Sequence, residues 1–141
     1  MNNIKRYLTD KLCLICGLTL FSLICFLFSL DYAFVLWLLA LVLTIFITDN
    51  RLIIYLFEKR HIQKMSMKAI DHVFEERALT AKSGCFLLWK FETEDGRFLI
   101  LLDPTLVSYK SIGQRKMELK DKNFIVSYYK HSKLIIALEE Q

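Results

Sequence analysis

Two cysteines near the N-terminus, Cys13 and Cys16, have the two-residue spacing that is typical of redox and metal-binding motifs. They lie inside a long apolar run that holds no second cysteine pair and no histidine. A thiolate there would be strongly desolvated, whereas a neutral thiol packs well as a small apolar group. We therefore interpret Cys13, Cys16 and Cys25 as packing residues. For these and for Cys85 we expect no disulfide.

The three histidines do not form a metal-binding pattern either. His61, His72 and His131 are far apart in the sequence and have no cysteine partner at a ligand spacing. Glu75 and Glu76 follow His72 closely, but acidic residues there also fit an ordinary solvent-exposed face. The sequence has no phosphate-binding glycine loop, nucleophile elbow or paired-carboxylate motif. We therefore predict no enzymatic activity, no metal and no cofactor.

The cysteine pair belongs to an uncharged run from Leu12 to Leu30. Its length of about 19 residues is that of an α-helix crossing a hydrocarbon core about 30 Å thick. After Asp31 and Tyr32 comes a second uncharged run, 33–48, of about 16 residues, which needs neighbouring residues to complete a span. We expect two transmembrane helices joined as a hairpin. A cleaved signal peptide fits less well, because the first run is long and no small-residue cleavage site follows it.

Basic residues flank both apolar runs and are absent from the turn between them. They are Lys5, Arg6 and Lys11 before the first run, and Arg51, Lys59, Arg60, Lys64 and Lys68 after the second. By the positive-inside rule, we predict a multi-pass protein of the inner (plasma) membrane with both termini in the cytoplasm. The net charge of +4 fits this bias and an attraction to anionic headgroups, so we expect membrane lipids and no nucleic acid as partners.

A polar cluster, Asp49-Asn50-Arg51, interrupts the apolar sequence before it resumes at 52–57. In one interpretation the second helix leaves the membrane at Thr48, and 52–57 lies at the interface. In the other the helix continues to Phe57, and the polar cluster is embedded and paired. We favour the first, and assign 1–57 to the transmembrane hairpin.

The next segment, 58–82, mixes apolar and charged residues at three- and four-residue steps, which predicts an amphipathic juxtamembrane helix. Ile62, Met65 and Val73 mark its apolar stripe. The stripe fits a helix that covers the adjacent domain, a coiled-coil or partner-helix surface, or a helix lying on headgroups.

From 83 to 141 the pattern changes to strands and predicts a small antiparallel β-domain, either a curved sheet or a partly open barrel. Asp95-Gly96 between two apolar runs predicts a hairpin, and a second is expected with its turn at 130–133. Segments 106–109 and 116–120 are predicted as shorter strands. Trp89 and Phe91 should share a buried face, with Lys90 on the other face, rather than form a platform that stacks nucleic-acid bases.

The predicted fold class is thus an α+β membrane protein with a hairpin, an amphipathic helix and a β-domain. In architecture it resembles small bacterial membrane proteins that carry an OB-type or pleckstrin-homology-like domain. We expect a non-enzymatic accessory or regulatory subunit of an inner-membrane assembly of the secretion, conjugation, exclusion, immunity or defence type. Its partners would be other membrane-protein subunits or itself, and a cytoplasmic protein. The alternative is a membrane-anchored sensor or effector whose β-domain binds a small anionic ligand or a lipid headgroup.

The residues expected to serve these roles fall into three groups. Those predicted to contact a partner or headgroup are Arg51, Lys59, Arg60, Lys64, Lys68, Arg115, Lys116 and Lys120. The predicted helix interface is Ile62, Met65 and Val73. Small residues predicted to pack membrane helices are Gly17, Ser22, Ser29 and Ala40.

Overall fold

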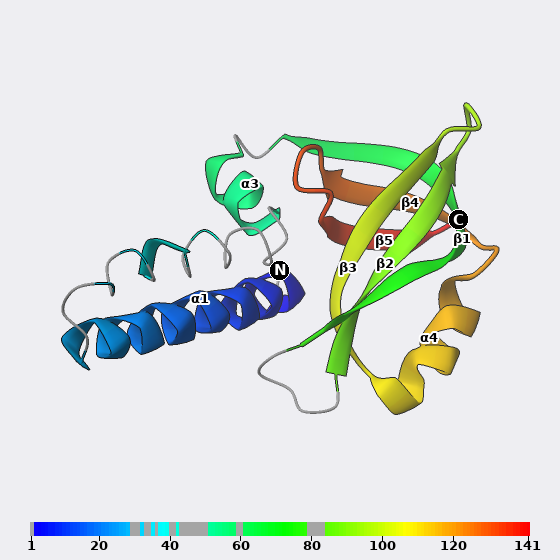
Figure 1. Cartoon of the computed structure of the whole chain (residues 1–141). Coiled ribbons are helices and arrows are strands. Elements are labelled where there is room, and N and C mark those ends of the chain that lie inside the picture. The colour runs from blue at the N-terminus through cyan, green and yellow to red at the C-terminus, as the bar shows by residue number, and fades with distance from the viewer. Residues whose placement is uncertain are drawn as a thin grey trace.

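The computed structural model describes residues 2–28, 51–58, 61–78 and 84–141, together with 32, 35, 37–39 and 42. The elements along the chain are α1 (Asn2–Phe28), α3 (Arg51–Phe57), β1 (Ile62–Arg77), β2 (Gly84–Thr93), β3 (Phe98–Ser108), η1 (Tyr109–Ser111), α4 (Ile112–Leu119), β4 (Asn123–Tyr129) and β5 (Ile135–Glu140). In Figure 1 the N-terminal end of α1 lies beside the sheet, and the rest of the helix extends away from it.

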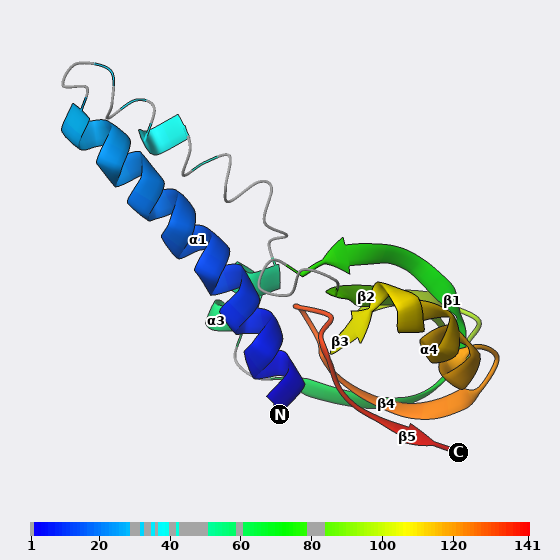
Figure 2. The same ribbon diagram turned by 90° about the horizontal axis from the view of Figure 1, so that it is seen from below.

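The five strands form one antiparallel sheet in the order β3-β2-β1-β4-β5. The long strand β1 pairs with β4 through its first half and with β2 through its second half, where two register shifts bend it. The sheet curls until β3 meets β5, and a parallel bridge joins Leu102 to Leu134. Figure 2 shows this curl, with α4 lying across it. The chain thus forms a five-stranded, strongly curved sheet with one α-helix between the third and fourth strands.

The core fills the inside of the curled sheet. Trp89 and Phe91 of β2 are fully buried there, while Lys90 between them faces outward and is half-buried, so the predicted alternation is confirmed. Two side chains of α4, Ile112 and Leu119, join the same cluster from one end. The helix therefore closes that end of the apolar core.

Both predicted turns are present. At the first, Gly96 has φ of +73°, and its N–H donates to the carbonyl of Thr93 at 2.9 Å. At the second, 130–133 joins β4 to β5, and the N–H of Lys133 donates to the carbonyl of Tyr129 at 3.0 Å. The register of β2 against β3 follows from the first turn, and that of β4 against β5 from the second.

Replacing Gly96 with Val should lower the free energy of unfolding of the protein by roughly 1 kcal/mol or more, because a β-branched residue adopts positive φ only at a cost. No atom lies within 4 Å of an added Cβ at this position, so the backbone is the cause and not a steric clash. The measurement is thermal or urea unfolding. Gly113→Ala is the matched control: it also meets no atom within 4 Å, but it lies in α4, and it should raise stability. An unchanged midpoint for Gly96→Val would contradict the role of this turn.

Two element predictions are wrong. Segment 58–82 is not an amphipathic helix, because 62–77 forms β1, which pairs with strands on both sides. The sheet therefore begins well before residue 83. Segment 116–120 is not a strand, because Ile112–Leu119 is the helix α4. The predicted strand 106–109 largely belongs to the end of β3, which runs to Ser108.

No helix among the described residues is long and apolar enough to cross a membrane. Helix α1 begins at Asn2, and its polar first turns contact the sheet. Most of the second run, 33–48, lies outside the described residues, as do Asp49 and Asn50. This finding contradicts the predicted transmembrane hairpin and, with it, the multi-pass inner-membrane location.

Candidate interaction surfaces

The first turns of α1 are fixed to the outer face of the sheet by an aromatic contact. Tyr7 is fully buried, and its ring meets the ring of Phe86 edge-on, with 5.0 Å between the ring centroids. Leu102 and Leu134 belong to the same apolar cluster, which is separate from the main core. Helix α1 therefore covers part of the outer face of β2 and β3.

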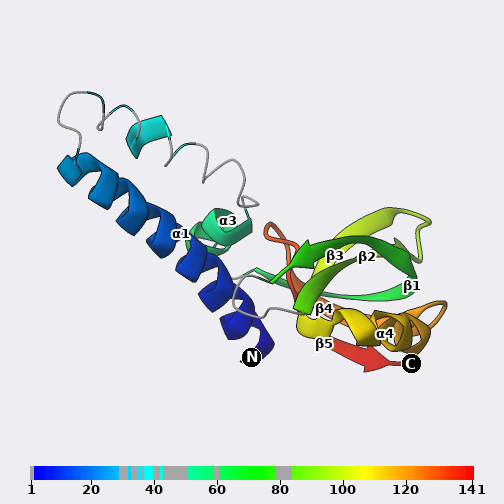
Figure 3. The ribbon, with the colours of Figure 1, turned by 60° about the horizontal axis from the view of Figure 1, so that its bottom comes forward.

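Polar contacts add to the same junction. Lys11 forms an ion pair with Glu76 of β1, and both side chains are largely buried. Asn3 donates from Nδ2 to Oγ1 of Thr105 on β3, at 3.2 Å. These contacts join α1 to two different strands, so they fix the direction in which the helix leaves the sheet, as Figure 3 shows.

Beyond Leu12, α1 exposes large apolar side chains. Leu20, Phe21, Leu27 and Phe28 expose 61%, 65%, 71% and 88% of their surface, and Leu12, Leu18, Leu23 and Ile24 are also exposed. At 3.6 residues per turn these positions cover most of the helix circumference. An exposed apolar surface of this extent is typical of a binding site for another apolar surface.

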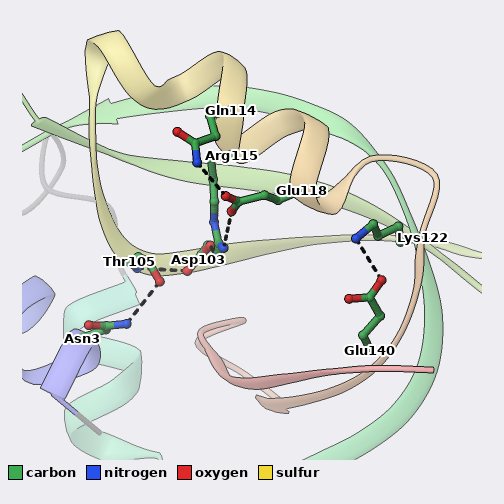
Figure 4. A network of polar contacts seen from close by, with 8 residues as sticks. All are labelled: Asn3, Asp103, Thr105, Gln114, Arg115, Glu118, Lys122 and Glu140. Atoms are coloured by element: carbon green, nitrogen blue, oxygen red, sulfur yellow. Dashed lines mark hydrogen bonds and ion pairs between the residues drawn. The ribbon is translucent and has the colours of Figure 1, made fainter.

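A polar network lies between β3 and α4 (Figure 4). Asp103 is buried and accepts from Arg115 at 2.8 Å through Oδ2, and from the N–H of Thr105 at 3.0 Å through Oδ1. Arg115 also contacts Glu118 at 3.3 Å. Burial lowers the pKa of the Arg115 guanidinium, but the two carboxylates outweigh this effect and hold the pKa above its ordinary value. Arg115 is therefore a cation already engaged by two anions.

The network borders a cavity of about 460 Å³ between β3, α4 and β5. Its second cation, Lys122, is paired with Glu140 at 2.8 Å. Each cation on the wall thus has a carboxylate partner of its own. The arrangement is suited to holding α4 against the sheet, and it offers no unpaired positive charge to a small anion.

Three of the described basic residues predicted to contact a partner form ion pairs within the β-domain. Lys64 pairs with Glu139 at 3.0 Å, Lys68 with Asp121 at 3.8 Å, and Lys120 with Asp71 at 3.9 Å. Arg51 begins α3 and is half-buried, and Lys116 is half-buried on α4. Lys59 and Arg60 lie outside the described residues. Their role in binding stays a prediction.

Ile62, Met65 and Val73 lie on β1 and are all exposed, with Val73 inside the second register shift. They form no helical stripe, because the segment is a strand. Of the predicted packing residues, Gly17 is exposed on α1 and Ser22 belongs to the same helix. Ser29 and Ala40 lie outside the described residues.

The candidate chemical residues are dispersed. Cys13 and Cys16 are free and exposed on α1, whereas Cys85 is buried in the core, where burial and the charge of Glu75 raise the pKa of its thiol. Among the described residues no group of three or more possible ligands could hold a metal ion.

His72 has a carboxylate near each ring nitrogen, Asp71 at Nδ1 and Glu75 at Nε2, both at 3.3 Å. Hydrogen bonds from the His72 ring and backbone N–H lower the pKa of the exposed Asp71. All three residues belong to the bent part of β1, and the Asp71 carboxylate is also 3.9 Å from Lys120. We interpret the group as an ion-pair cluster of the sheet surface.

The sequence alone does not indicate that Tyr7 fixes α1 to the sheet or that Asp103 binds Arg115. Tyr7 stands among basic residues that fit a membrane flank, and Asp103 stands beside Pro104 at the end of an apolar run. An acidic residue inside a strand pattern is a signal of a buried ion pair, and it could have indicated Asp103.

Comparisons with protein-family models, with curated proteins and with solved structures found no match to this chain.

Proposed function

We propose that the protein is a non-enzymatic accessory or regulatory subunit of a larger assembly, and that α1 binds apolar helices of another subunit. The observation that supports the proposal is the exposed apolar surface of α1 from Leu12 to Phe28. The β-domain holds the N-terminal turns of this helix in place and provides a second interaction surface.

The free energy available to such an interface is large. Burying one fully exposed Leu or Phe side chain contributes about 1.5–3 kcal/mol. Leu20, Phe21, Leu27 and Phe28 are each more than half exposed, so together they could supply most of the affinity of a stable complex. A helix that is apolar on most sides is normally surrounded by other apolar elements, which favours a partner with more than one helix.

The alternative, a sensor of a small anionic ligand, has less support. Arg115 and Lys122, which line the cavity between β3, α4 and β5, are each engaged by carboxylates. A ligand there would have to break these ion pairs before it gained its own.

The experiment is site-specific photo-cross-linking from Phe21 in the full-length chain, in the cells that produce it. We expect a cross-link of defined mass to a second protein. The double variant Leu20→Asp, Leu27→Asp should reduce this product at least about tenfold, because each charge would have to be desolvated in an apolar interface. The circular dichroism of its β-domain should stay unchanged.

The matched control places the same charges on exposed apolar side chains of the β-domain, in the double variant Phe98→Asp, Met117→Asp. This variant should keep the cross-link. Equal loss in the two double variants, or cross-links only between copies of this chain, would contradict the proposed partner.

A further inference from the structure

An open depression of about 770 Å³ lies between the end of α3 and the turn that joins β4 to β5. Ile54 and Phe57 of α3 form an apolar wall, and Phe57 exposes 83% of its surface. The turn contributes Lys130 and Lys133, and the remaining lining residues are Glu58, His61 and His131. Apolar and cationic side chains therefore border the same space.

The turn is held in place by Glu58, which directly follows α3. Its carboxylate accepts from the backbone N–H of His131 at 2.7 Å and of Ser132 at 3.2 Å. Burial raises the pKa of Glu58, but these hydrogen bonds outweigh it and leave the pKa below its ordinary value. The carboxylate is thus ionised, with its oxygens directed at the turn backbone. The N–H of Lys130 also donates to the carbonyl of His61 at 3.0 Å.

The two lysines keep their charge available. Among the described residues, the ion pairs formed by lysines do not include Lys130 or Lys133. The Lys133 ammonium lies 5.6 Å from the centroid of the Tyr128 ring. Two lysines and two apolar side chains thus border the depression, which matches an amphiphile with an anionic head.

We propose that this depression binds the surface of an anionic lipid layer. Lys130 and Lys133 contact the phosphate groups, and Phe57 and Ile54 enter the boundary between headgroups and acyl chains. The charge pattern alone would also suit an acidic peptide, but a peptide gives no reason for the almost complete exposure of Phe57 at the same edge. The contact is peripheral, needs no helix that crosses the layer, and does not depend on the proposed partner of α1.

The test is co-sedimentation of the full-length protein with vesicles. One set contains phosphatidylcholine alone, and the other also contains about one quarter phosphatidylglycerol. The exposed surface of α1 can bind both, so the quantity compared is the gain in affinity that the anionic lipid brings. Each lysine near such a surface contributes about fivefold, so Lys130→Gln with Lys133→Gln should reduce this gain in affinity about 25-fold.

A control of equal charge change is Arg97→Gln with Lys110→Gln, two exposed positions on other parts of the β-domain. This pair should lose less than about twofold. For the apolar side, Phe57→Ser should weaken binding to both vesicle types, whereas Phe98→Ser should not.

Three results would overturn the proposal. They are a wild-type protein that gains nothing from phosphatidylglycerol, a lysine variant that keeps the gain, and a control pair that loses as much as the lysine pair. Release from anionic vesicles by a short polyglutamate peptide at micromolar concentration, with no effect of Phe57→Ser, would reassign the surface to an acidic protein.

Discussion

Trp89→Ala should lower the free energy of unfolding of the β-domain by about 3–5 kcal/mol. Trp89 is fully buried at the centre of β2, where it belongs to the main core cluster together with Leu101 and Val126. Removing the indole leaves a cavity that the paired backbone of three strands cannot collapse to fill. In thermal unfolding, the midpoint should fall by about 12 °C or more.

Two controls make this result interpretable. Trp89→Phe should cost clearly less, because it keeps a large ring and removes an indole N–H that has no acceptor among the described residues. Phe74→Ala, on the same sheet but 61% exposed, should change the midpoint little. If Trp89→Ala and Phe74→Ala lowered it equally, the interior of the curled sheet would not be the core.

Tyr7→Ala should release α1 from the sheet while leaving the β-domain folded. The Tyr7 ring belongs to a cluster separate from the main core, so its loss removes an apolar contact worth about 3 kcal/mol from the junction alone. Amide hydrogens in the first turns of α1 should then exchange about 100-fold faster, because the ratio of docked to undocked helix falls by about that factor. Protection of β2 next to Trp89 should stay unchanged.

Arg6→Ala is the neighbouring control, since Arg6 is exposed on the same turn and should leave exchange in α1 as it is. The opposite outcome is equally informative. If Tyr7→Ala lowered protection in α1 and in β2 to the same extent, the helix and the sheet would unfold as one cooperative unit, and the junction would not be a separate contact.

The strands and turns of the C-terminal half could be predicted because their signals are local. Asp95-Gly96 indicates a turn whatever the rest of the chain does, and the alternation around Trp89 has the period of a strand. The sequence could not identify what covers the outer face of β2, because the contact of Tyr7 with Phe86 joins distant parts of the chain.

Strand β1 was misread for a physical reason. An undisturbed strand would alternate, but the register shifts between Ala69 and Asp71 and between His72 and Phe74 each break the alternation. The apolar residues then recur at three- and four-residue steps, which is also the period of a helix. Pairing with β2 and β4 decides between the two, and such pairing is not visible in the segment itself.

Helix α4 shows the reverse error. Its buried residues, Ile112 and Leu119, are seven positions apart, which is two turns of a helix. Few apolar residues lie between them, so the segment resembled a short polar strand. The membrane prediction depended on the apolar runs and on the basic residues that flank them. In the structure one of these flanking residues, Lys11, is instead buried in an ion pair with Glu76 of β1.

Because the sheet does not close fully between β3 and β5, β5 is an edge strand. Backbone N–H and C=O groups of an edge strand can pair with a strand of another molecule and extend the sheet. β5 is only six residues long and ends in Glu139 and Glu140, which are held by lysines of β1 and of the loop before β4. Short length and charge are both features that keep strand edges of separate molecules apart. Part of this protection against fibril formation is electrostatic and solvent-exposed, so it weakens as the ionic strength rises.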